Sequence, residues 1–302
     1  MPMGWVYTTF YHDNWGVKIG GGGAILKQKG VYEGARGNVT GWQHYKGEQQ
    51  SSCEVGGEDP VLTPDAAVIN GHVAMLQNMV EIGADPSRKM GNNSYIDIAV
   101  QWGHVGILDY LRHSTRLSSY NLDARKQRGM ASAHTAAQKG HSPVMEWLAS
   151  QQANLAVKVK GSGHTPMHLA AEFGHTEVMK VLLANGRAED ALAKTKPYEA
   201  TPVHTAAENG HAKVLRILAD IVPAAALASK MANGATAGHL CAGYGHVACI
   251  ELLVNLSTPL TGQDATGNTP ADYAKKGAGP GQKAVLKLLK RAGLDPDDYD
   301  EL

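Results

Sequence analysis

The chain has 302 residues, of which 28 are basic and 28 are acidic, so its formal net charge is zero. Balanced charge produces no overall field that would attract nucleic acid or an anionic membrane, and we expect neither as a partner. Only three cysteines occur, so no disulfide framework is expected. The cytoplasm or another reducing intracellular compartment, an organelle included, is the predicted location.

Signals for targeting or membrane insertion are weak along the chain. The first seventeen residues contain no lysine, no arginine and no apolar core, which argues against a signal or transit peptide. The longest apolar-leaning run, residues 217–228, is interrupted by Asp220 and Pro223 and is too short to span a bilayer. The ending Tyr-Asp-Glu-Leu resembles a retention signal without its leading Lys or His, so we interpret residues 294–302 as an acidic, solvated tail.

Residues 1–57 differ in composition from the rest of the chain, because they are rich in both glycine and aromatic side chains. Such a segment favours a small β structure or an extended path, and we expect strands at residues 5–11, 17–19 and 24–26. Two roles stay open and are compatible with each other. The segment covers the first helical unit, or it contacts a partner with Trp5 and Trp15 as anchors.

Residues 163–186 predict two short helices joined by a tight turn. Thr165 is a side-chain N-cap, and Pro166 occupies the first helical position, where its missing N–H costs nothing. Gly174 ends the first helix, since glycine adopts the left-handed conformation without a Cβ penalty. An apolar stripe at helical spacing follows on the second helix. Such a pair cannot bury its stripe alone and requires neighbours.

The Gly-His pair of this stretch recurs at successive spacings of 32, 37, 34, 36 and 35 residues, and a seventh unit that ends at Gly277 lacks the histidine. The segments that begin at Thr165 and Thr201 read Thr-Pro-Met-His-Leu-Ala-Ala and Thr-Pro-Val-His-Thr-Ala-Ala. Both the period and these segments resemble the ankyrin repeat, with its signature T-P-L-H-x-A. The resemblance covers about residues 58–293.

The resemblance implies an all-α solenoid of about seven helix-turn-helix repeats over residues 58–293, with residues 1–57 as a separate extension that is partly β or extended. It also implies that the first-helix histidine packs between repeats, with its ring bonded near the threonine at the helix start. The expected framework residues are Thr165, Pro166, His168, Gly174, His175, Thr201, Pro202, His204, Gly210 and His211.

In the family that the chain resembles, the first helices and the loops before them commonly bind partners on a concave face. The residues just before each Gly-His pair vary in chemistry while the helical frame stays similar, which is typical of a contact surface. Stacking of the aromatic members on neighbouring repeats, or on the N-terminal segment, is the alternative. The candidates on this face are Trp102, Lys139, Glu172, Phe173, Asn209 and Tyr244, and those in the loops are Arg125, Arg128, His164 and Tyr198.

Catalytic, nucleotide and metal sites find no support in the sequence. The glycine run at residues 20–23 is followed by neither a Gly-Lys-Ser/Thr end nor the dinucleotide spacing. Ten of the fourteen histidines belong to the repeat pattern, and His164 precedes the N-cap of its helix, so we do not expect it to project beside His168. No serine lies in a Gly-x-Ser-x-Gly elbow. We therefore expect no metal and no cofactor.

The sequence predicts a non-catalytic adaptor or scaffold that binds a partner protein through the concave groove and the loops between repeats. A structural subunit of a larger assembly, anchored by residues 1–57, is the alternative, and an enzyme with an unrecognised site is the third. The chain is expected to be a monomer in isolation or a subunit of a hetero-complex. The sequence does not identify the partner.

Overall fold

The computed structural model describes residues 63–113, 120–126, 129–277 and 279–294, and the backbone of four strands before them. Trp5, Arg128, the strand expected at residues 5–11 and residues 295–302 of the acidic tail lie outside the described residues, as does the side chain of Trp15. Contacts divide the chain into two compact units, residues 1–120 and residues 121–302. Each unit is described by itself. The boundaries predicted after residues 57 and 293 stay predictions.

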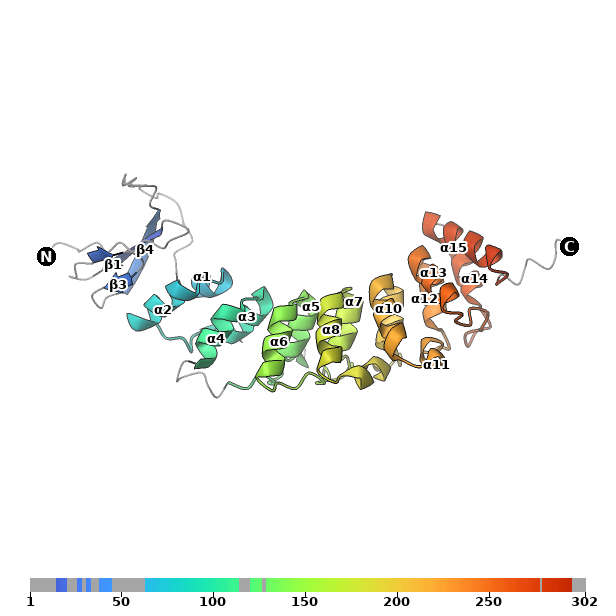
Figure 1. The fold of residues 1–302 in the computed structure, drawn as a ribbon, viewed down its shortest axis with the longest axis horizontal. Helices are drawn as coiled ribbons and strands as arrows, with labels where there is room; N and C mark the ends of the chain where they lie inside the picture. Colours follow the sequence, from blue (N-terminus) through green and yellow to red (C-terminus); the bar gives the residue numbers. More distant parts are fainter. Residues whose placement is uncertain are drawn as a thin grey trace. The chain divides into compact units, whose positions relative to one another are not determined.

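The first unit begins with two short antiparallel strand pairs (Figure 1, blue). Strand β1 (Trp15–Gly20) pairs with β4 (Asn38–His44), and β2 (Leu26–Gln28) pairs with β3 (Val31–Glu33). The strand expected at residues 17–19 lies within β1, and β2 begins at the last residue of the strand expected at 24–26. The extension is therefore β in part.

Two helix pairs complete the first unit. They are α1 (Pro64–Ile69) with α2 (Val73–Glu81), and α3 (Tyr95–Trp102) with α4 (Val105–His113), and the hairpin of β5 (Lys89–Met90) and β6 (Asn93–Ser94) joins them. Where the signature histidine is replaced by Asp97, the carboxylate accepts hydrogen bonds from the backbone N and the hydroxyl of Ser94, at 2.8 and 2.7 Å. The aspartate thus makes the same local cap that a histidine would.

The second unit contains five further helix pairs. They are α5 (Ser132–Lys139) with α6 (Ser142–Ser150), α7 (Pro166–Glu172) with α8 (Thr176–Ala184), α9 (Pro202–Glu208) with α10 (Ala212–Ile221), α12 (Ala237–Tyr244) with α13 (Val247–Asn255), and α14 (Pro270–Lys276) with α15 (Pro280–Arg291). A 3-10 turn, η2 (Ala188–Leu192), follows α8, and a single turn, α11 (Ala224–Leu227), follows α10.

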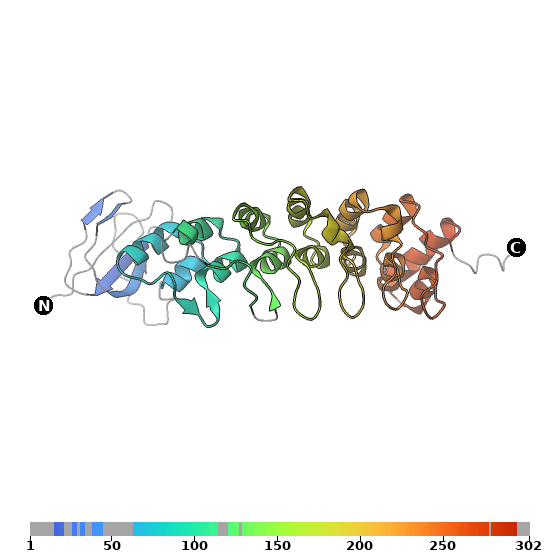
Figure 2. The ribbon, with the colours of Figure 1, turned by 90° about the horizontal axis from the view of Figure 1, so that it is seen from below.

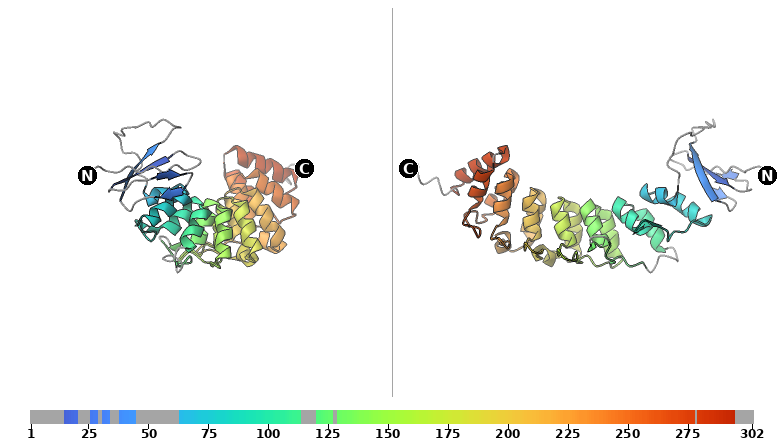
Figure 3. Two further views of the ribbon diagram at one scale, coloured as in Figure 1. Left: turned by 60° about the vertical axis from the view of Figure 1, so that its left-hand side comes forward. Right: turned by 180° about the vertical axis from the view of Figure 1, so that it is seen from behind.

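The helices of the second unit form two layers (Figure 2). First helices contact first helices in the order α5, α7, α9, α12 and α14, and second helices contact second helices in the order α6, α8, α10, α13 and α15. The view from behind shows the pairs stacked in chain order (Figure 3, right). In the second unit each pair therefore makes its main contacts with its neighbours in the sequence, which is the arrangement of a solenoid. The predicted all-α repeat architecture is confirmed.

The core lies between the two layers. Ala170 and Ala171 of α7 are fully buried, and their small side chains let the neighbouring helices approach closely. Val178, Met179 and Leu182 of α8 bury the apolar stripe against the same interior. Among the helices that the structure describes, none combines the length and the hydrophobicity needed to cross a bilayer.

The Gly-His pairs join consecutive repeats. In the second unit, the ring N–H of His175 donates to Gln138 O at 3.1 Å, that of His211 to Glu172 O at 2.9 Å, and that of His246 to Glu208 O at 2.8 Å. In the first unit, His104 and Ile69 O make the same bond at 2.7 Å. Each acceptor belongs to the preceding repeat, so these bonds tie one repeat to the next.

The last junction uses another side chain. Here Gln282 Nε2 donates to Gly243 O at 2.9 Å. Since the seventh repeat lacks the histidine, an amide N–H takes over the same donor role. The exposed side chains Lys283, Lys287, Lys290 and Arg291 of α15 give the final repeat a polar outer face.

Candidate partner-binding surface

The first-helix histidines are buried within the solenoid. His168 Nδ1 accepts from Thr165 N at 3.2 Å, and its Nε2–H donates to Ala200 O of the next repeat at 3.2 Å. His204 repeats this arrangement with Thr201 N and Ser229 O. With both ring nitrogens in use, these histidines hold the loop that precedes one repeat against the loop that precedes the next.

Burial keeps these rings neutral. Desolvation lowers the pKa of His168 and of His204 to about 4, although their bonds to backbone carbonyls oppose the shift. The pKa values of His134 and His239 are lowered for the same reason. Neutral imidazoles satisfied on both sides are structural elements, and they are unavailable to a ligand.

One expectation about the histidines is wrong. His164 and His168 do come together, with ring centroids 5.6 Å apart at an interplanar angle of 64°. The loop before Thr165 turns back over the helix start, because Val159 N donates to His164 O at 2.8 Å, and this turn places the His164 ring beside α7. His164 O also accepts from His134 Nε2 at 3.0 Å. Within the described ranges, no group of three His, Cys, Asp or Glu residues could hold a metal ion.

Within each unit, the variable positions at the ends of the first helices form a surface that we call the first-helix face. In the second unit, Lys139, Asn209 and Tyr244 are exposed and Glu172 is half-buried. Phe173 is 43% exposed, which is high for a phenylalanine in a regular scaffold. Trp102 ends α3 in the first unit with 52% of its surface exposed. The structure thus leaves the predicted aromatic candidates accessible.

Two of these aromatic rings are held in place by the Gly-His framework. The Phe173 ring stacks on His175 with centroids 6.2 Å apart and an interplanar angle of 16°, and Tyr244 stacks on His246 at 6.0 Å and 21°. Both histidines are fixed by their bonds to the preceding repeat. The Tyr244 hydroxyl also lies 3.4 Å from the Glu208 carboxylate of that repeat. Each ring is therefore positioned on one side and exposed on the other.

A hollow of about 340 Å³ adjoins Tyr244, between α12 and α14. Tyr244, Leu240 and Gly243 line it from α12, and Tyr273 and Lys276 line it from α14. Gly243 stands where other repeats carry a longer side chain, and a Cβ there would lie 3.1 Å from Tyr273 Cδ1. The ring of Tyr273 thus packs over a position without a side chain. Sequence reasoning missed Tyr273, although the glycine two residues before Gly-His was visible.

The loop candidates lie in the connections that precede the first helices. Tyr198 is 67% exposed, and its backbone carbonyl accepts from Ala232 N at 2.9 Å. Arg125 is exposed in the connection before α5, and His164 is half-buried in the connection before α7. The main-chain carbonyls of Tyr198 and His164 accept hydrogen bonds from neighbouring repeats.

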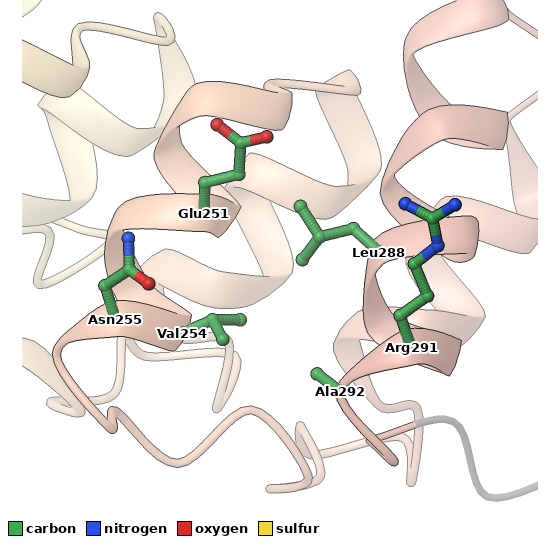
Figure 4. A pocket seen from close by; sticks show the side chains of 6 residues that line it. All are labelled: Glu251, Val254, Asn255, Leu288, Arg291 and Ala292. Carbon is green, nitrogen blue, oxygen red and sulfur yellow. The ribbon is translucent and has the colours of Figure 1, made fainter.

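A second hollow, of about 470 Å³, lies on the second-helix layer between α13 and α15 (Figure 4). Leu288 points into the space between the two helices, and the oppositely charged Glu251 and Arg291 lie on its two sides. None of the predicted contact residues lines this hollow. It lies on the other layer from the first-helix face.

The sequence of the helix pairs matches one known protein family. Residues 113–193, 133–226 and 188–255 each match the family described as ankyrin repeats, in three copies. The chain contains ankyrin repeats over residues 113–255. The matches begin at the end of α4 and end with α13, so they leave out the helix pairs of the first unit and the pair of α14 with α15.

The ankyrin framework also accounts for two of the cysteines. Cys241 of α12 and Cys249 of α13 are buried and free. Hydrogen bonding to Cys249 and burial raise the pKa of the Cys241 thiol well above its usual value. A buried, protonated thiol is a packing element of its ankyrin repeat.

Proposed function

We propose that the chain is a non-catalytic adaptor or scaffold that holds a partner protein against the first-helix face and the connections between repeats. Ankyrin repeats are in general protein–protein interaction modules, which supports this class of function. The observation that carries the proposal is the stacking of Phe173 on His175 and of Tyr244 on His246. Two aromatic rings, each roughly half-exposed, are presented on a fixed support.

The energetics of association favour such rings as anchors. Binding costs free energy because side chains at the interface lose rotamer freedom, and a ring that is already stacked has less freedom to lose. Aromatic residues also dominate the binding energy of most protein interfaces. Phe173 and Tyr244 therefore combine large apolar area with a low cost of ordering. Glu172 and Asn209 would supply polar contacts around them.

The test is capture of the partner by the full chain, followed by mass spectrometry. A chain carrying Phe173→Ser and Tyr244→Ser should lose its stoichiometric partner while its thermal melting temperature changes little. The matched control carries Ile221→Ser, which removes an apolar side chain of similar exposure, 38%, from the second helix α10, outside both the first-helix face and the connections. The control should capture the partner as the unaltered chain does. Equal capture by both variants would reject the first-helix face.

A further inference from the structure

Lysine side chains recur at one position of the connections between repeats. Counted back from the glycine of each Gly-His pair, the fourteenth residue is lysine in four consecutive repeats, at positions 89, 126, 160 and 196. Neighbouring positions in the second unit carry three more lysines. Five of these side chains are exposed, and we call them the loop-tip lysines: Lys158, Lys160, Lys194, Lys196 and Lys230.

The connections that carry them lie side by side. Lys196 N donates to Ser162 O at 2.8 Å, and Ala232 N donates to Tyr198 O at 2.9 Å. Main-chain bonds therefore run from the connection before α7 to the one before α9, and from there to the one before α12. Neighbouring first helices are in contact, and packed helices lie about 8–10 Å apart, so we expect the connections that carry the loop-tip lysines to repeat at about that spacing.

Most of this positive charge is not neutralised. The side chains of Lys158, Lys160 and Lys196 make neither a hydrogen bond nor an ion pair within the described residues. Lys194 pairs with Glu199 at 2.7 Å, and Lys230 Nζ donates to Gln263 O at 2.9 Å. Residues 153–164 and 222–235 contain no Asp or Glu. A chain of zero net charge thus concentrates cations along one edge.

The row of loop-tip lysines ends at the connection before α14. There an acidic residue, Asp264, stands near the equivalent position, and its carboxylate accepts from Thr266 N, Asn268 N and the Tyr273 hydroxyl at 2.8–2.9 Å. Those bonds keep the pKa of Asp264 well below its usual range, against the effect of desolvation, so the carboxylate stays ionised. The basic edge is therefore limited to the connections before α7, α9 and α12.

We propose that the loop-tip lysines bind an extended acidic segment of a partner protein with a carboxylate at every third residue. An extended chain advances about 3.3 Å per residue, so three residues span about 10 Å and match the spacing of neighbouring connections. The exposed ring of Tyr198, two residues after Lys196, offers an apolar contact within the row. The proposal rests on the proposed protein-binding function and names the chemistry of the partner.

A peptide fits this edge better than a nucleic acid does. Nucleic acids are attracted by the phosphate-neutralising charge of a whole binding face, which is strongly basic in proteins that bind them. Here Glu199 lies within the row itself, and the chain as a whole carries no net charge. Spaced carboxylates can meet separate lysines and avoid Glu199, whereas a continuous polyphosphate cannot.

The experiment measures peptide binding to the full chain by fluorescence anisotropy at low salt. The probe is a labelled peptide of four Glu-Ser-Gly triplets, and its isomer with four consecutive glutamates is the comparison. The spaced peptide should bind more tightly than the isomer. Lys160→Glu with Lys196→Glu should weaken its binding by about tenfold, since two attractions become repulsions. Lys283→Glu with Lys287→Glu, which reverse exposed charges on α15, should change it by less than about twofold.

Three results would overturn the proposal: equal affinity for both peptides, equal weakening by both pairs of substitutions, or no binding. Tighter binding of a twelve-nucleotide single strand, lost in the Lys160→Glu, Lys196→Glu chain, would assign the edge to nucleic acid instead. The same peptide experiment distinguishes a failure of this proposal from a failure of the proposed binding at the first-helix face. The Phe173→Ser, Tyr244→Ser chain should bind the spaced peptide normally, whatever its effect on partner capture.

Discussion

The imidazole of His211 lies directly against Gly174 of the preceding repeat. A Cβ placed on Gly174 would lie 2.6 Å from His211 Nδ1, far inside van der Waals contact. The ring cannot simply move away, because its Nε2–H donates to Glu172 O at 2.9 Å. Glycine is therefore required at position 174 for two reasons. Its φ of +76° at the helix end disfavours other residues, and the His211 ring occupies the place of a Cβ.

Substitution of Gly174 by alanine should separate these two requirements. We expect Gly174→Ala to lower the free energy of unfolding by about 2–4 kcal/mol, through left-handed strain and overpacking together. Gly186→Ala is the matched control, because Gly186 has a φ of +72° but no atom within 4 Å of its Cβ position. That control should cost only about 1–2 kcal/mol. Equal losses in urea denaturation would mean that contact with His211 is unimportant.

Stability should fall as the solution becomes acidic. The pKa of His168 and of His204 is about 4 in the folded chain, below the value of about 6.5 in an unfolded chain. The unfolded state therefore binds more protons, and stability present above pH 6.5 is lost as the pH falls towards 4. At pH 5 each histidine should cost about 2 kcal/mol relative to pH 7.5.

Urea denaturation at several pH values would measure this loss. His168→Gln should flatten the dependence of the unfolding free energy on pH below 6.5, because glutamine does not titrate. His72→Gln replaces an exposed ring and should leave the slope as it is in the unaltered chain. A slope that is the same in the His168→Gln chain and the unaltered chain would contradict the assigned cause.

The last repeat should depend on Gln282. Loss of its amide in Gln282→Ala would leave Gly243 O without this donor, at a cost of about 1–2 kcal/mol. Hydrogen exchange in α14 and α15 should then become faster, with little change in α7 and α8, because a solenoid unfolds from its ends. Lys283→Ala, next in the sequence and exposed, is the control and should not alter exchange.

Local features of the repeats could be predicted from sequence. Thr165 as N-cap, Pro166 at the first helical position and Gly174 at the turn all follow from backbone chemistry over a few residues. The family resemblance, supported by the period of the Gly-His pairs, led to the all-α solenoid. Such features are readable because the interactions that cause them are close in the sequence.

Contacts between repeats could not be predicted in the same way. His211 and Gly174 are 37 positions apart, and their contact depends on how two helix pairs pack. The meeting of His164 with His168 depends on a loop that folds back through Val159 N and His164 O, which no helix periodicity encodes. Two of the loop-tip lysines, Lys160 and Lys196, stand fourteen residues before the glycine of their repeat, and the sequence alone shows this offset. That the connections which carry these lysines lie side by side could be seen only from the main-chain hydrogen bonds between them.

At every described junction between repeats, the hydrogen-bond acceptor is a main-chain carbonyl. This decides which amino-acid substitutions the junctions tolerate. The residues that supply it are Ile69, Gln138, Glu172, Glu208 and Gly243, five positions with four kinds of side chain. A mutation at such a position alters the surface and keeps the junction, because the carbonyl belongs to the backbone. New binding preferences can therefore arise at little cost in folding stability at Ile69, Gln138, Glu172 and Glu208, whereas a Cβ at Gly243 would press against Tyr273.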